Sequence, residues 1–150
     1  MASRFVQGKF TPKNPHKYAG DIDKIRYMSS WELEVHTFLD SNPNILLWSS
    51  ECVAIKYLKP TDNRVHTYYP DYWVEYVDRT GEIKRKLVEV KPASQTKAPN
   101  GNRKHALYEK LTFAVNAAKW QAAINWCKLK SAQDGITIEF EIMTERSIFK

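Results

Sequence analysis

The segment YPDYWVEYVDRTGEIKRKLVEVK, residues 69–91, predicts two β-strands joined by a turn at residues 78–82. The turn contains aspartate and glycine, which are common turn formers. Side chains alternate between the two faces of a strand, so Glu89 and Lys91 project from one face while the valines beside them point into a core from the other. If Asp71 lies at the entry of the neighbouring strand, an aspartate, a glutamate and a lysine meet at one point.

Such a grouping favours a bound metal ion. Two carboxylates about 4 Å apart repel each other by roughly 4 kcal/mol at an effective dielectric of about 20. One lysine offsets part of this repulsion, and a divalent cation offsets more, because hard cations such as Mg²⁺ favour carboxylate oxygens. Such an ion lowers the pKa of a bound water and stabilises charge on a phosphodiester during hydrolysis. Lys91 could orient the attacking water or neutralise the charge that develops on the phosphate. The alternative is a surface hairpin with solvated charges, since these residue types often occur at such spacings by chance.

The composition is typical of one globular domain that buries a single core. Hydrophobic residues make up 43% of the 150 residues and aromatic residues 13%, which excludes a disordered chain. No apolar run is long enough to span a membrane, and the N-terminal residues lack the apolar segment of a signal peptide. Cys52 and Cys127 have neither metal-ligand nor C-x-x-C spacing, so we expect both to be reduced core residues in a cytosolic protein.

The positive charge of the chain indicates an anionic partner. The net charge is +6 and the isoelectric point about 9.3. Between residues 84 and 104, Glu89 is the only acid. The basic residues of that span are Lys84, Arg85, Lys86, Lys91, Lys97, Arg103 and Lys104. Positive charge around a carboxylate site is what a phosphate backbone requires. A solvated basic strand edge is an equally good explanation.

The N-terminal residues 1–26 are interpreted as an irregular basic arm, followed by one domain over residues 27–150. The basic residues of the arm are Arg4, Lys9, Lys13, Lys17, Lys24 and Arg26. Only Asp21 and Asp23 oppose them, and no periodicity appears. The arm could lie on the domain, on DNA or on a protein partner, and the sequence does not choose among these.

A helix is expected to begin after Ser29, because Ser29 and Glu32 have the spacing of a capping box. Its apolar face consists of Trp31, Val35, Phe38 and Leu39. Local sequence favours a capping role for Glu32 over a role as a functional acid.

The rest of the chain alternates between strand and helix patterns. Strands are predicted at residues 45–48, 52–58, 64–69, 72–77 and 136–142. A helical pattern covers about residues 103–130 and is long enough for two helices. The polar loop between them, residues 92–102, could close over a substrate or be an inert connector. This order predicts an α/β fold: a sandwich with a mixed β-sheet flanked by helices.

The acidic residues and their order resemble a known nuclease superfamily. Glu32, Pro70-Asp71 and Glu89-Val90-Lys91 are similar to the PD-(D/E)XK nucleases, which carry an acid on an early helix, an Asp at a strand start and (D/E)-x-K on the next strand. The segments at residues 29–32, 66–71 and 89–92 look like those of TnsA-type transposition endonucleases. A phage Holliday-junction endonuclease shares a similar pattern. Over essentially its whole length, the chain resembles the small head-completion nucleases of large contractile-tailed phages.

The resemblance implies a restriction-endonuclease-like core and a role for each site residue. Asp71 and Glu89 would hold Mg²⁺ or Mn²⁺ with the Val90 carbonyl, and Lys91 would position or activate the water. Glu32 would be a third acid that shares a metal or orders its waters. The residues expected to contact nucleic acid are His66, Lys84, Lys86, Lys97, Arg103 and Lys104.

The implied function is metal-dependent endonuclease activity on double-stranded DNA. It would finish the packaged DNA end during phage head completion, before the tail joins the capsid. Capsid or portal-vertex proteins are expected partners, with no membrane and no small-molecule cofactor. The expected location is the host cytoplasm during assembly, or the virion. Two alternatives stay open: a non-enzymatic DNA or capsid adaptor at the head-tail vertex, and a junction-resolving endonuclease.

Overall fold

The computed structural model describes residues 6–101 and 105–148. A four-stranded mixed sheet lies at its centre, with strand order β3-β6-β7-β8. The strands are β3 (Ile45–Ser50), β6 (Tyr72–Val77), β7 (Ile83–Val90) and β8 (Ile138–Met143). The first three are antiparallel, and β8 runs parallel to β7. The turn predicted at residues 78–82 therefore joins β6 to β7 as expected.

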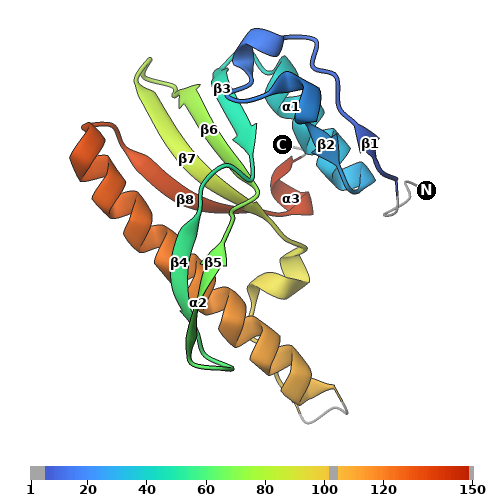
Figure 1. Ribbon diagram of the computed structural model, residues 1–150, viewed down its shortest axis with the longest axis vertical. Helices are drawn as coiled ribbons and strands as arrows, with labels where there is room; N and C mark the ends of the chain where they lie inside the picture. The colour runs from blue at the N-terminus through green and yellow to red at the C-terminus, as the bar shows by residue number, and fades with distance from the viewer. Residues whose placement is uncertain (1–5, 102–104, 149–150) are drawn as a thin grey trace.

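Helices cover both faces of this sheet, which gives the predicted α/β sandwich (Figure 1). The helix α1 (Ser30–Ser41) packs Val35 and Leu39 against the apolar side chains of one face. The helix α2 (Ala106–Asp134) packs Trp120 and Cys127 against the other. No helix in the described ranges has the length and apolar character needed to cross a membrane.

A second hairpin extends from the sheet alongside α2 (Figure 1). It consists of β4 (Ile55–Lys59) and β5 (Arg64–Tyr68), and its buried side chains join the core under α2. The strand predicted from residue 52 thus begins only at residue 55. Cys52 is exposed, so the expectation of two core cysteines is wrong for this one, whereas Cys127 is buried.

The long C-terminal helical pattern forms one helix and not two. Between its ends it contains no glycine or proline, and Gly135 stops it with a left-handed backbone at φ +68°. At 1.5 Å per residue the helix is roughly 43 Å long, more than the sheet can cover. Leu107 and Leu129, near its two ends, are 71% and 67% exposed although they fit the apolar pattern.

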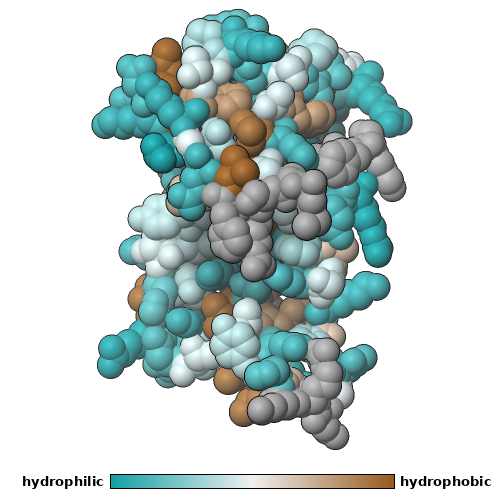
Figure 2. Space-filling view, turned by 90° about the vertical axis from the view of Figure 1, so that its right-hand side faces the viewer, coloured by the Kyte–Doolittle hydropathy of each residue, from teal (hydrophilic) through white to brown (hydrophobic). Residues whose placement is uncertain are grey.

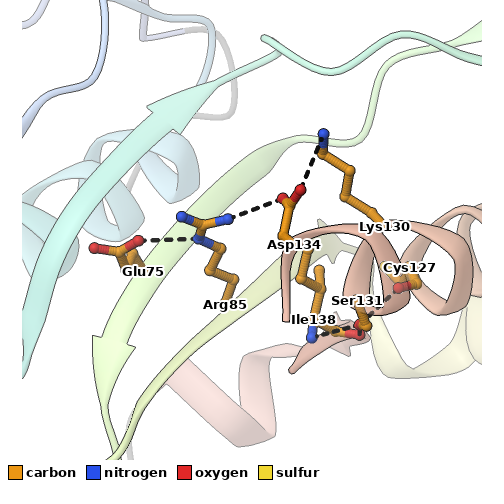
Figure 3. Close-up of polar contacts among 7 residues, drawn as sticks. All are labelled: Glu75, Arg85, Cys127, Lys130, Ser131, Asp134 and Ile138. Atoms are coloured by element: carbon orange, nitrogen blue, oxygen red, sulfur yellow. Dashed lines mark hydrogen bonds and ion pairs between the residues drawn. The ribbon is translucent and has the colours of Figure 1, made fainter. Parts of the chain in front are cut away.

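The C-terminal end of α2 is fixed to the sheet by polar contacts (Figure 3). Arg85 of β7 donates to Glu75 of β6 at 2.9 Å and to Asp134 of α2 at 3.2 Å. The Ser131 hydroxyl accepts the Ile138 N–H at 2.8 Å, and so joins α2 to β8. These contacts link the C-terminal end of α2 to the strands β6, β7 and β8.

The described part of the arm lies on the domain. Its elements are β1 (Gly8–Lys9), the 3₁₀ turns η1 (Pro15–Lys17) and η2 (Ile22–Lys24), and β2 (Arg26–Tyr27), which pairs with β1. Phe10 and Ile25 are buried in the core under α1. The domain boundary at residue 26 stays a prediction, but residues 6–26 contribute to the core of the domain.

Asp40 at the end of α1 anchors this arm. Its carboxylate accepts the backbone N–H groups of Lys13 at 2.9 Å and Asn14 at 3.1 Å. Its carbonyl accepts the buried Lys17 ammonium at 2.9 Å. Hydrogen bonds to a charged group are among the stronger ones.

We predict that Asp40→Ala lowers the free energy of unfolding by about 2–3 kcal/mol, because two backbone donors lose a charged acceptor. Urea denaturation measures this loss, and limited proteolysis should show faster cleavage in the arm. Asp23→Ala, which removes an exposed carboxylate from the same arm, should stay within about 0.5 kcal/mol of the parent. Equal urea midpoints for all three proteins would show that Asp40 does not hold the arm.

Candidate active site

Asp71 is fixed at the point where β5 leads into β6. It follows the fully buried Pro70, and its carbonyl accepts the Glu51 N–H at 3.0 Å. Its carboxylate accepts the Val90 N–H at 2.8 Å, across to the last residue of β7. This bond places the Asp71 carboxylate next to the Glu89-Val90-Lys91 motif, as the sequence predicted.

Glu89 and Lys91 lie on the side of the sheet that faces α2. Glu89 is 7% exposed, and the Lys91 ammonium is 3.8 Å from its carboxylate. Val88 and Val90 pack into the opposite core, under α1. The alternation read from the sequence is thus present, and it brings an aspartate, a glutamate and a lysine together.

Burial makes the two carboxylates resist ionisation. It raises the pKa of Glu89 to about 7, and the charge of Asp71 adds to the rise. Burial also raises the pKa of Asp71, opposed by the Val90 N–H and by the positive charges of Lys91 and Lys119. Glu89 is therefore partly protonated near neutral pH in the metal-free protein, and a bound cation would replace that proton.

Glu32 lies in the first turn of α1, which Ser29 caps, and also faces this site. Its backbone N–H donates to the Ser29 hydroxyl at 3.1 Å, which is half of the predicted capping box. Its carboxylate lines a cavity of about 560 Å³ together with Asp71 and Val90. Burial raises the pKa of Glu32, a hydrogen bond with the Met28 backbone opposes this, and the charge of Asp71 adds to it.

The donor set fits a hard divalent cation. In the described ranges, no three side chains of His, Cys, Asp or Glu come close enough to form a metal site by themselves. Asp71 and Glu89 nevertheless bring two carboxylates together, and one Glu89 oxygen is buried without a hydrogen-bond partner. Mg²⁺ often binds through one or two carboxylates and keeps several waters. Val90, which lines the same cavity as Asp71, could add its backbone carbonyl oxygen.

Two residues that the sequence did not single out complete the α2 side of the site. The hydroxyl of the buried Tyr68 has no hydrogen-bond partner, and burial with the nearby charge of Glu89 raises its pKa. The Lys119 ammonium lies 5.6 Å from the centre of the Tyr68 ring. Lys119 comes from the middle of α2, and nothing in its local sequence distinguishes it from other helix lysines.

The residues expected to contact nucleic acid do not gather at the cavity. His66 lies on the β4–β5 hairpin and pairs with Asp62 at 2.8 Å. Lys97 is exposed in the segment after the 3₁₀ helix η3 (Ala93–Thr96). Arg103 and Lys104 lie outside the described residues.

Lys84 and Lys86 are placed toward the far end of β7 from Glu89. The Lys84 ammonium is 3.0 Å from Asp78, and the Lys86 ammonium is 2.8 Å from Glu141. Their charges are thus partly neutralised. The basic side chains that do line the cavity are Lys24 and Arg26, from the arm.

We predict that the metal-free protein loses stability as the pH rises, because the native pKa of Glu89, about 7, exceeds its ordinary value of 4.5. The stabilisation is fully present below about pH 4.5 and is lost as the pH rises through 7. Each pKa unit is worth about 1.4 kcal/mol, so the difference between 4.5 and about 7 corresponds to a loss of roughly 3 kcal/mol.

Urea unfolding in a chelator between pH 5 and 8.5 measures this loss. Glu89→Gln should flatten the pH dependence, whereas Glu34→Gln, on the exposed side of α1, should not. Parallel curves for the parent and Glu89→Gln would contradict the raised pKa.

Comparison with known proteins identifies the family. The family described as TnsA-like endonuclease N terminal matches residues 42–145 of the chain, which include Asp71, Glu89 and Lys91. The head completion nuclease of Enterobacteria phage T4 is 34% identical over 145 residues, which cover 92% of this chain and 90% of that protein. No solved structure shows a significant match. Both matches span most of the chain, which therefore belongs to the TnsA-like endonuclease family.

Proposed function

We propose that this protein is a metal-dependent endonuclease that hydrolyses phosphodiester bonds of double-stranded DNA. The observation that carries the proposal is the meeting of Asp71, Glu89 and Lys91 at the end of β7, where one buried Glu89 oxygen has no hydrogen-bond partner. Membership of the endonuclease family supports the reaction class. The cation is Mg²⁺ or Mn²⁺, since the donors are all oxygens.

The acidic residues hold the cation in this mechanism. Asp71 and Glu89 would hold it through their carboxylates, and Val90 would contribute its carbonyl. The Val90 N–H keeps the Asp71 carboxylate oriented, and Glu32 holds waters on the cavity side. When bound, Mg²⁺ or Mn²⁺ supplies a water of lowered pKa and offsets negative charge on the phosphate.

Lys91 is the residue that acts on the attacking water. Its ammonium lies beside Glu89, and about a quarter of its side chain (27%) is exposed, so substrate can reach it. It orients the water for attack and stabilises the charge that develops on the phosphate oxygens. Lys119 adds a second positive charge from α2, which already acts on Asp71.

The proposed biological role follows from the likeness to the T4 relative, a head completion nuclease. By this likeness the protein finishes the packaged DNA end during head completion, before the tail joins. Its partners are then double-stranded DNA and proteins of the capsid or portal vertex. It acts in the host cytoplasm during assembly, or stays with the virion.

We predict that the parent protein cleaves supercoiled and linear duplex DNA with Mg²⁺ or Mn²⁺, and that Asp71→Asn and Lys91→Ala each lose about 100-fold or more in rate. Gel-based cleavage assays measure the rates. Lys128→Ala removes an exposed lysine near the C-terminal end of α2 and should cleave DNA at the rate of the parent.

Equal residual cleavage in the parent, Asp71→Asn and Lys91→Ala would reject the proposal. Normal head completion by Asp71→Asn would instead indicate an adaptor without enzymatic activity. A four-way junction in the same assay identifies a junction-resolving enzyme by preferred cleavage at the junction.

A further inference from the structure

The cavity beside Asp71 has walls of opposite charge. Glu32, Glu51 and Asp71 contribute carboxylates from α1 and from the ends of the sheet strands. Lys24 and Arg26 contribute cations from the arm. At about 560 Å³, the cavity is within the range of pockets that enclose a drug-sized ligand, which is also the scale of one nucleotide.

The two walls do not neutralise each other. None of the ion pairs among the described residues joins Lys24 or Arg26 to Glu32, Glu51 or Asp71. Lys24 has only a long contact of 3.9 Å with Asp21, and both side chains are largely exposed. Both cations are therefore available to an anion that enters the cavity.

The position of Arg26 is fixed through its backbone. Its carbonyl is 2.9 Å from Nε2 of the buried His36, whose Nδ1 is 2.8 Å from the Tyr72 hydroxyl. A carbonyl can only accept, so Nε2 carries the proton and Nδ1 accepts from Tyr72. Burial lowers the pKa of His36, which keeps the ring neutral for this arrangement. Tyr72 directly follows Asp71, so the network connects the arm to the proposed catalytic strand.

We propose that Lys24 and Arg26 form a second phosphate-binding site, which holds the DNA backbone next to the phosphate that is cleaved. This inference rests on the proposed nuclease function. The ligand is a phosphodiester of the substrate strand: its anionic oxygens contact the arm cations while the neighbouring phosphate contacts the metal side. Arg26 is suited to this role because its guanidinium presents several donors in a fixed plane.

The surroundings of the arm suit a charged ligand better than an apolar one. Figure 2 shows the side of the molecule that carries β1, β2 and α1 in Figure 1, and its visible surface is mostly hydrophilic with scattered apolar groups. Of the arm's basic residues, Lys24 and Arg26 line the cavity, whereas the exposed Lys9 and Lys13 lie outside its lining. Phosphate contacts of this kind contribute affinity without reading sequence.

The salt dependence of DNA binding tests the proposal. Each phosphate that a cation neutralises adds about 0.9 to the slope of log affinity against log salt concentration. Binding of a duplex oligonucleotide is measured without metal in the Asp71→Asn background, so that the DNA stays intact. Lys24→Ala and Arg26→Ala should each reduce the slope by about 1, and the double variant by about 2. Lys13→Ala, which removes an arm charge outside the cavity lining, should leave the slope unchanged, and Arg26→Lys should retain it.

Cleavage rates of the parent, Lys24→Ala and Arg26→Ala, all with Asp71 intact, separate this inference from the proposed function. If the parent cleaves but Lys24→Ala and Arg26→Ala keep the slope of Lys13→Ala, the phosphate site is overturned and the nuclease stands. If the parent does not cleave but the slopes fall as expected, the phosphate site stands and the nuclease is overturned. A lower urea midpoint in Arg26→Ala with an unchanged slope would show that the Arg26 side chain has a structural role only, and would overturn the site.

Discussion

The hydrogen bond from the Val90 N–H to the Asp71 carboxylate determines how the two halves of the proposed site meet. β6 and β7 are antiparallel neighbours, so the start of one lies beside the end of the other. The bond holds Asp71 against the residue that follows Glu89. Two carboxylates are thus confined to a partly dehydrated place, where burial raises the pKa of both and the charge of Asp71 raises the pKa of Glu89 further. The positive charges of Lys91 and Lys119 lower the pKa of Asp71, but burial still leaves it raised.

The core on each side of the sheet makes that confinement possible. Under α1, the valines of β7 pack with Tyr72 and with Phe10 and Ile25 from the arm. Under α2, Tyr68 and Leu87 pack with Trp120. The site lies between these two cores, at the end of the strands, where Glu32 approaches from one layer and Lys119 from the other. The arm is part of this construction, because removing residues 1–26 would take core side chains and cavity cations away together.

Local patterns were sufficient to predict the hairpin, the alternation of Glu89 and Val90, and the helix start at Ser29, because each depends on residues close in sequence. Lys119 and Arg26 reach the site through packing between distant elements, which no local pattern describes. Tyr68 is close to Asp71 in sequence, but nothing in its local pattern distinguishes it from the other tyrosines. The number of basic residues around Glu89 was misleading in one respect. Lys84 and Lys86 lie on the same strand as Glu89, but each forms an ion pair with another acidic residue. The length of α2 followed from the absence of glycine and proline before Gly135, which the apolar pattern alone did not reveal.

The central claim is that Asp71 and Glu89 hold a divalent cation together. Anomalous diffraction from crystals grown with Mn²⁺ tests it most directly, because the ion is located independently of activity. The account predicts an anomalous peak in contact with both carboxylates and with the Val90 carbonyl. A Mn²⁺ peak bound elsewhere, with Asp71 and Glu89 contacting only protein and water, would contradict it.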